Sequence, residues 1–216
     1  MIIAIDGPAG AGKSTVAKIL AQRLGFLYID TGAMYRALTL KAMEDNIDIN
    51  NHELLVKMAR DTKIDLVSSD GSLRVLLDGR DVTREIRDPK VTKLVSDLAK
   101  IKGVREEMLK LQRQLGMLKD SVLEGRDIGT VVFPDAEKKF YLDAKFNERV
   151  DRRYKELKGQ NRQVESEEVA EDLNNRDTID SSREFAPLKK AEDALYVDTT
   201  PLTIEEVVQT LLQHIA

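Results

Sequence analysis

The spacing of apolar residues in the first part of the chain alternates between two periods. Residues 2–5 form a short continuous apolar run, which is typical of a fully buried strand. Apolar residues then recur at helical spacing over residues 12–24, and Gly25 follows as a stop. Residues 26–29 predict a second strand, and residues 31–42 a second helix. Strands that alternate with helices in this way predict a parallel sheet with crossover helices, an α/β fold.

This rhythm changes between about residues 62 and 84. Short strand patterns separated by turn residues predict a β-hairpin and a third short strand, inserted as a small lobe into the α/β chain. The strands are expected at 63–67, 73–77 and 81–82, with turns at 69–71 and 78–79. Pro89 then stands at a first-turn position and opens a helical stretch that is expected to reach about residue 118.

The α/β rhythm resumes in the last part of the chain. Strands are expected at 121–124, 139–142 and 194–197, and helices at 146–157, about 166–179 and 203–215. Thr203 and Glu206 form a capping box at the start of the last helix. The segment 158–168 is polar and is predicted to be mobile.

One glycine-rich segment carries a chemical signature. Residues 7–14, GPAGAGKS, match G-x-x-x-x-G-K-[ST] and lie between a predicted strand and a predicted helix. In this motif backbone N–H groups and the helix N-terminus surround phosphate, the lysine reaches the β- and γ-phosphates, and the serine hydroxyl holds Mg²⁺. A chance glycine-rich turn is the alternative, and the strand and helix on either side argue against it. The expected ATP-binding residues are Gly7, Pro8, Ala9, Gly10, Ala11, Gly12, Lys13, Ser14 and Thr15, with Ser14 on Mg²⁺.

Composition and charge narrow the class of protein. The 216 residues carry 34 basic and 38 acidic side chains, a net charge of −4, which argues against general binding to nucleic acids or anionic membranes. The chain has no cysteine, and its two histidines, His52 and His214, are expected at the surface. No basic leader and no run of about 18 apolar residues is present. We therefore expect a cytoplasmic protein without disulfides or a membrane segment.

Arginines cluster at positions where a second phosphate could bind. Arg36 lies one turn into a helix that follows a strand, and residues 125–127, Gly-Arg-Asp, follow another strand. Further arginines lie in residues 149–153 and 176–183. The last two groups could be ordinary solvated helix faces or surface ion pairs. When the arginine clusters are considered together with the phosphate loop, a site for two phosphorylated ligands is the better interpretation, because phosphoryl transfer needs cations around two anionic partners.

Several longer segments resemble the bacterial cytidylate kinases, which are P-loop nucleoside monophosphate kinases. They are IDGPAGAGKST at 5–15, DTGAMYR at 30–36, LDGRDVT at 77–83, EGRDIGTVVFPDA at 124–136, and the arginines, aspartates and PL between 176 and 188. The resemblance runs from about residue 2 to the C-terminus. It implies a three-layer P-loop NTPase fold with a five-stranded parallel sheet flanked by helices, an inserted substrate lobe and a short lid. The implied activity is transfer of a phosphoryl group from ATP to CMP or dCMP, with Mg²⁺.

The resemblance also implies domain limits and residue roles. Residues 1–30 and 119–216 would form the core, including a lid at about 149–165, and residues 31–118 the monophosphate-binding segment with its β insertion at about 62–84. Lys13, Arg126, Asp127 and Arg153 would be catalytic, and Arg149 would join Arg153 in a lid that reaches in on closure. The monophosphate would contact Thr31, Tyr35, Arg36, Ser96, Arg105, Arg126, Asp127, Arg176, Asp180 and Arg183. Among these, Arg36 and Arg126 would hold the α-phosphate, Ser96, Arg105, Asp127 and Arg183 the cytosine, and Arg176 and Asp180 the sugar.

Two other functions stay open at this stage. A kinase for another nucleotide or for a metabolite such as shikimate would share the phosphate loop, although the long segment 62–118 favours a larger acceptor. A P-loop switch or regulatory NTPase is the alternative of another class, and the chain has no N-K-x-D segment of the kind that reads guanine. Preference for cytosine over uracil rests on the resemblance. ATP and CMP or dCMP are the expected partners, and the protein is expected to act as a monomer.

Overall fold

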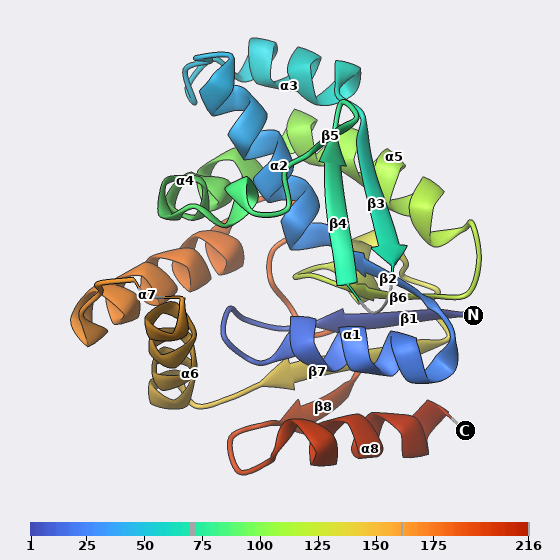
Figure 1. Ribbon diagram of the computed structural model, residues 1–216. Helices are drawn as coiled ribbons and strands as arrows, with labels where there is room; N and C mark the ends of the chain where they lie inside the picture. The colour runs from blue at the N-terminus through green and yellow to red at the C-terminus, as the bar shows by residue number, and fades with distance from the viewer. Residues whose placement is uncertain (70–71, 161, 216) are drawn as a thin grey trace.

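The centre of the computed structural model, which describes residues 1–69, 72–160 and 162–215, is a five-stranded parallel sheet (Figure 1). All four neighbouring pairs of strands are parallel. The strand order is β2 (Leu27–Asp30), β6 (Ser121–Glu124), β1 (Ile2–Asp6), β7 (Lys138–Asp143) and β8 (Leu195–Asp198). The predicted α/β class and the five-stranded parallel sheet are therefore confirmed.

Helices cover both faces of this sheet, because alternate strand residues point to opposite sides. Ile3 packs in one apolar cluster with Leu20 and Leu211, and Ala4 packs in another with Leu38. The helices on the first face are α1 (Lys13–Leu24) and α8 (Ile204–Ile215), and those on the second include α2 (Thr31–Glu44) and α5 (Lys102–Gly116). The result is the expected three-layer arrangement.

The strand register brings three acidic residues to one edge of the sheet. Glu124 is in register with both Ile5 on β1 and Asp30 on β2, and Asp6 is the next residue of β1. These positions are the carboxyl ends of three adjacent parallel strands, and α1 and α2 begin just beyond them. In open α/β sheets this edge is where ligands bind.

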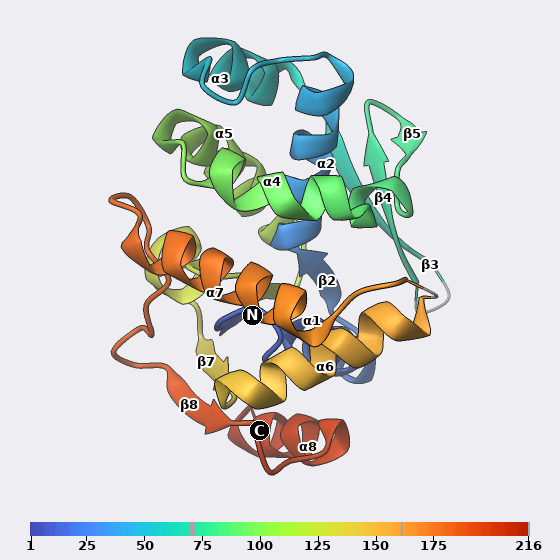
Figure 2. The ribbon, with the colours of Figure 1, turned by 90° about the vertical axis from the view of Figure 1, so that its left-hand side faces the viewer.

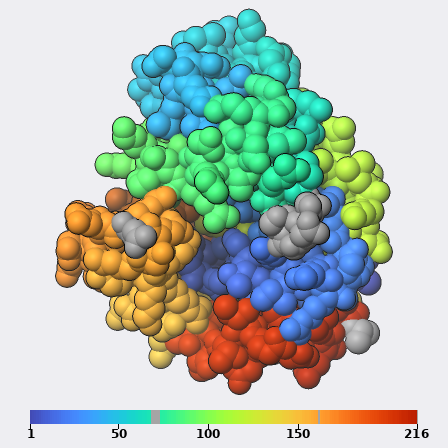
Figure 3. Space-filling model, in the orientation of Figure 1, coloured from blue at the N-terminus to red at the C-terminus, as the bar shows by residue number. Residues whose placement is uncertain are grey.

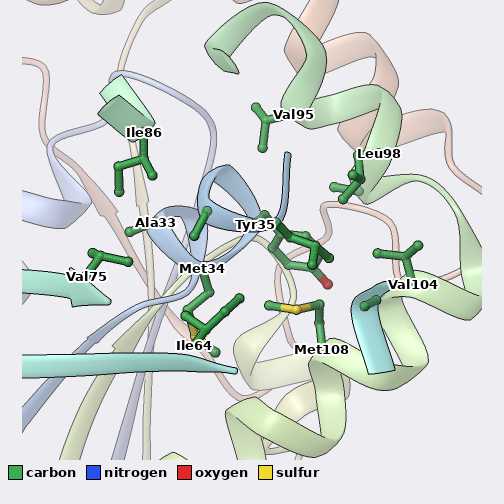
Figure 4. Packing of buried hydrophobic residues seen from close by; sticks show 14 of the residues in the cluster. Ala33, Met34, Tyr35, Ile64, Val75, Ile86, Val95, Leu98, Val104 and Met108 are labelled. Atoms are coloured by element: carbon green, nitrogen blue, oxygen red, sulfur yellow. The ribbon is translucent and has the colours of Figure 1, made fainter. Parts of the chain in front are cut away.

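A second, antiparallel sheet forms the predicted lobe. It contains β3 (Ile64–Ser69), β4 (Ser72–Leu77) and β5 (Arg80–Asp81), so the expected insertion is confirmed, while its expected turn at 69–71 lies partly outside the described residues. Figure 4 shows Ile64 and Val75 of this sheet beside Met34 of α2 and Ile86. The same core holds Tyr35, so packing of the lobe positions a residue of the expected substrate site. The lobe also includes α3 (His52–Asp61) and a 3₁₀ turn, η1 (Glu85–Arg87).

The helical stretch expected from Pro89 to about residue 118 is present, but it is divided in two. The structure has two helices there, α4 (Pro89–Ala99) and α5, separated by Lys100 and by Ile101, which is extended and has its side chain buried. Gly103, in the first turn of α5, lies against Val56 just after the break. Arg105 in the first turn of α5 donates from Nη1 to the carbonyl of Ala99 at 3.2 Å, and so satisfies the end of α4. The break turns Arg105 back toward the sheet edge.

The remaining elements follow the expected order with small shifts. A π-helical turn that the pattern did not indicate, η2 (Ile128–Val132), follows β6. Helices α6 (Phe146–Gly159) and α7 (Ser166–Ser182) flank the polar segment. The capping box is confirmed, since Glu206 accepts from the backbone N–H of Thr203 at 2.8 Å and Thr203 Oγ1 accepts from that of Glu206 at 3.3 Å. Both histidines are exposed. Among the described residues, no helix is long and apolar enough to cross a membrane.

Candidate functional site

The glycine-rich segment forms a tight loop between β1 and α1. Gly7 adopts φ +144°, and a Cβ there would lie 1.9 Å from the backbone oxygen of Leu142, so no other residue fits. Gly12 has a left-handed conformation at the N-cap of α1, where no described side chain caps the helix. The N–H groups of the first turn of α1 therefore remain available for an anion, as the motif predicts.

The loop opens on a cleft of about 1170 Å³ between the core, the lobe and the α6–α7 pair. In Figure 3 this region is the hollow between the orange α6–α7 segment and the blue N-terminal part. All expected site residues except Gly7, Pro8 and Arg149 line it. They are Ala9, Gly10, Ala11, Gly12, Lys13, Ser14, Thr15, Thr31, Tyr35, Arg36, Ser96, Arg105, Arg126, Asp127, Arg153, Arg176, Asp180 and Arg183. Tertiary structure thus brings together residues that are spread over 170 positions or more of sequence.

Lys13 lies buried at the bottom of the cleft. Its Nζ donates to the carbonyl of Pro8 at 2.7 Å. Burial lowers the pKa of this ammonium group, and the charge of Arg126 adds to that effect, while Glu124 and Asp6 oppose it. A buried cation of this kind is stabilised when phosphate oxygens approach it, because the phosphate charge compensates for the lost hydration.

Three arginines from separate parts of the chain, Arg36 of α2, Arg126 after β6 and Arg176 of α7, line the cleft. Arg126 donates from Nε to Asp180 at 2.8 Å, and Arg36 donates to Asp30 at 3.1 Å. Burial lowers the pKa of Arg176 to about 10, and the charge of Arg126 contributes to this shift. The lowering means that the carboxylates of Asp172 and Asp180 do not fully compensate for the burial of this guanidinium beside Arg126. The acceptor side of the cleft is therefore suited to an anion such as a phosphate.

A buried cluster of Arg105, Asp127 and Arg183 forms the far end of the cleft. Arg105 donates to Asp127 Oδ2 at 2.5 Å, and Arg183 lies 3.8 Å from Asp127 Oδ1. The Arg105 guanidinium stands 5.4 Å from the ring centroid of Tyr35. Among the described residues, the Nε of Arg105 and an Nη of Arg183 are buried without a hydrogen-bond partner. Such donors, next to a carboxylate acceptor, match the acceptor and amino groups at the edge of a cytosine.

Two expected residues make contacts inside the protein. Thr31 donates from Oγ1 to the carbonyl of Glu124 at 2.7 Å, so its hydroxyl joins the ends of β2 and β6. Arg149 was expected to reach into the site from a lid, but its guanidinium is buried against the phosphate loop, where it donates to the carbonyl of Ala9 at 3.0 Å. Arg153 does line the cleft, and its neighbour Arg152 is held by Thr199 through bonds of 2.7 and 2.9 Å.

Sequence reasoning assigned no role to Glu124, which lies under the phosphate loop. Its carboxylate is buried at the carboxyl end of β6 and accepts from the hydroxyl of Tyr28 at 3.2 Å. Burial raises its pKa, the charge of Asp30 adds to the rise, and Lys13 and the hydroxyl of Ser14 oppose it. An acidic residue that directly ends a buried strand beside the phosphate loop was the signal that could have identified it.

Asp6 is a second residue without an expected role. Its carboxylate accepts from the backbone N–H groups of Ile128 at 2.8 Å and of Gly129 at 2.7 Å. These bonds hold the start of η2, directly after the segment that carries Arg126 and Asp127. One residue at the end of β1 thereby fixes the segment that follows β6.

Replacing Asp6 with alanine should lower the free energy of unfolding by about 2–4 kcal/mol, because two buried N–H groups lose their acceptor. Asp6→Asn keeps one acceptor oxygen and should fall between the alanine variant and the wild type. Urea unfolding near pH 4 measures the difference, because there the opposing cost of burying an ionised carboxyl, whose pKa burial raises to about 7, is small. An alanine variant within 0.5 kcal/mol of the wild type would contradict this anchoring role, since that is the range of ordinary surface changes.

Comparison with known proteins gives matches along nearly the whole chain. The sequence model of one protein family, described as Cytidylate kinase, matches residues 3–216. A cytidylate kinase of Caldanaerobacter subterraneus subsp. tengcongensis is 53% identical over 213 residues, which cover 99% of this chain and 93% of the relative. One from Clostridioides difficile is 51% identical, covering 100% and 98% of the two chains, and one from Bacillus subtilis is 48% identical, covering 99% and 95%.

Solved structures with low sequence identity share the fold. An uncharacterised protein from Eubacterium ventriosum aligns with a TM-score of 0.54 at 12% identity, covering 100% of this chain and 98% of the other. A shikimate kinase from Bacteroides thetaiotaomicron aligns with a TM-score of 0.50 at 13% identity, again covering 100% and 98%. These two alignments concern the fold alone.

Proposed function

The chain belongs to the cytidylate kinase family, and we propose that it transfers the γ-phosphoryl group of ATP to CMP or dCMP in the cleft between its phosphate loop and its arginine-rich acceptor side. Identities of 48–53% with cytidylate kinases over nearly the full length carry this assignment. The products are ADP and CDP or dCDP. A monomeric state and a cytoplasmic location stay predictions.

The residues of this chain would align the ATP and acceptor phosphates and stabilise the negative charge on the transferring group. The attacking oxygen of the acceptor phosphate is already anionic, so no strong general base is needed. Lys13 and the N–H groups of the loop would hold the ATP phosphates, while Arg36 and Arg126 would hold the acceptor phosphate by bidentate contacts. Arg153, on α6, lines the same cleft and would add positive charge at the transferring group. Holding both partners in line can lower the barrier by about 7–11 kcal/mol.

Cytosine and the sugar would bind on the side of the acceptor phosphate that faces away from ATP. Asp127 would accept from the amino group of cytosine, and Arg105 and Arg183 would donate to its ring nitrogen and carbonyl oxygen. Ser96, buried on α4 beside this cluster, would contribute its hydroxyl. Arg176 and Asp180 would contact the sugar. Arg105, Arg176 and Arg183 each have a buried nitrogen without a partner among the described residues, which supports these roles.

A turnover assay tests the assignment directly. ADP release would be followed with Mg·ATP and, separately, CMP, dCMP, UMP, AMP, GMP and shikimate. High turnover with CMP and dCMP is the expected result. A preference for AMP, GMP or shikimate would contradict the cytosine assignment, and ATP binding without turnover on any acceptor would indicate a regulatory module instead.

The residues below the phosphate loop suit Mg²⁺, the cation that this reaction employs with ATP. Ser14, Glu124 and Asp30 offer only oxygen donors, the type that Mg²⁺ prefers, and the raised pKa of Glu124 marks a carboxylate that a nearby cation would stabilise. Ser14 would hold the ion directly, and Glu124 and Asp30 would orient its water ligands. The ion supplies charge neutralisation between the phosphates.

Removing divalent cations with EDTA should abolish turnover, and Glu124→Gln should raise the Mg²⁺ concentration needed for half-maximal rate by roughly tenfold, as outer-shell partners typically do. Rates measured over a range of Mg²⁺ at fixed ATP give this value. Glu192→Gln, an exposed residue away from the cleft, is the matched control. An unchanged Mg²⁺ requirement in Glu124→Gln would remove Glu124 from the cation site.

A further inference from the structure

Helices α6 and α7 pack on the phosphate loop at one residue. Figure 2 shows the two helices side by side, beyond the ends of the central strands. Their small apolar cluster consists of Val150, Leu157, Val169 and Leu173, and Ala9 of the phosphate loop is its remaining fully buried member. Packing of the α6–α7 pair therefore depends on the position of Ala9.

A pair of charged residues holds the peptide groups of the same loop residue. Arg149 on α6 donates from Nη1 to the carbonyl of Ala9 at 3.0 Å and to Asp177 Oδ2 on α7 at 2.5 Å. Asp177 Oδ1 in turn accepts from the N–H of Ala9 at 3.4 Å. The next loop residue, Gly10, packs against α6 so closely that a Cβ there would lie 3.0 Å from the Cβ of Arg149. Ala9 thus contacts both helices, and Gly10 contacts α6, within the loop that would surround the ATP phosphates.

The same helix α7 also carries the acceptor side of the cleft. Arg176 is the neighbour of Asp177, and Asp180 follows one turn later and accepts from Arg126 Nε at 2.8 Å. Asp177 and Asp180 are separated by about 4.5 Å along a continuous helix, which moves as a unit. A shift of α7 relative to Ala9 would therefore also shift the partners of Arg126.

We propose that Arg149 and Asp177 are positioning residues that couple the two substrate sites. An ATP phosphate group in the loop favours the conformation of Ala9 and Gly10 to which the pair is bonded. The pair then holds α7 where Arg176 and Asp180 contact the acceptor nucleotide. This inference rests on the proposed roles of the loop and of α7, and it adds that each substrate strengthens binding of the other by the same factor.

Calorimetric titration of CMP, with and without a saturating β,γ-imido analogue of ATP and Mg²⁺, tests the coupling. We expect the analogue to tighten CMP binding about fivefold or more in the wild type, and CMP to tighten binding of the analogue by the same factor. In Asp177→Asn the analogue should change the dissociation constant of CMP by less than about twofold. A residue with a merely structural role would weaken CMP binding equally with and without the analogue, leaving the factor unchanged.

Two further variants keep the test decisive. Arg149→Lys retains the charge but loses the planar group whose Nε bonds the carbonyl of Ala144 while its Nη1 bonds Ala9 and Asp177, so it should lose the coupling too, even if Asp177→Asn does not fold. Glu171→Gln, an exposed change on α7, should keep the wild-type factor. The coupling would be overturned, and the proposed function would not, if the ATP analogue left CMP affinity of the wild type unchanged while turnover was normal. The same conclusion would follow if the analogue tightened CMP binding in Asp177→Asn or Arg149→Lys as much as in the wild type. A wild type that binds no CMP would overturn the proposed function as well.

Discussion

Replacing Lys13 with methionine should lower kcat/KM for CMP phosphorylation by roughly 10³-fold, the usual effect of removing a cation aligned on a transferring phosphoryl group. Methionine has a similar length and keeps the apolar part of the side chain. The loss should fall mainly on kcat, because charge builds up on the transferring oxygens in the transition state. Steady-state rates at saturating CMP and ATP measure it.

The same substitution should leave the protein at least as stable as the wild type at pH 7. Burial lowers the pKa of Lys13 below that of the unfolded chain, so the folded state binds the lysine proton less tightly. The resulting cost is greatest below the lowered pKa and disappears above the ordinary value near 10.5. Urea midpoints at pH 7 check this, with Lys93→Met on the exposed side of α4 as control. An inactive variant with a clearly lower midpoint would attribute the loss to misfolding instead.

Asp127→Ala should lower the free energy of unfolding of the nucleotide-free protein by about 3–5 kcal/mol, because it leaves Arg105 and Arg183 buried without their shared carboxylate. The exposed pair of Asp97 and Lys100 offers a matched control, and Asp97→Ala should cost less than about 1 kcal/mol. Urea unfolding of both variants gives the comparison. Equal effects of the two substitutions would contradict a buried ionic cluster at the end of the cleft.

Asp127→Asn separates recognition from stability. Its amide can donate to the carbonyl that uracil carries where cytosine has an amino group, so the ratio of kcat/KM for CMP to that for UMP should fall by roughly 10- to 100-fold. Parallel assays with CMP and UMP measure this ratio. An unchanged ratio, with both rates lowered equally, would mean that Asp127 supports the site without reading the base.

Most of the fold could be predicted from local sequence. Buried strands appear as short apolar runs, and α1 follows from helical spacing closed by Gly25, because both patterns depend on neighbouring residues alone. The break between α4 and α5 could not be predicted in this way. It depends on the burial of Ile101 and on the bond from Arg105 to Ala99, both of which require the packed lobe.

The sequence by itself determined the nucleotide chemistry, since the phosphate loop and the arginines after strands are local motifs whose residue types limit what they can bind. Only the tertiary structure decided which charged groups meet. Strand register places Glu124 beside Asp30, and folding brings Asp6 to η2 and Asp177 to Ala9. It also turns Arg149 from an expected lid residue into a contact of the phosphate loop. Such pairings join residues that are distant in the chain, and burial then sets their charge state, so neither can be read from local pattern.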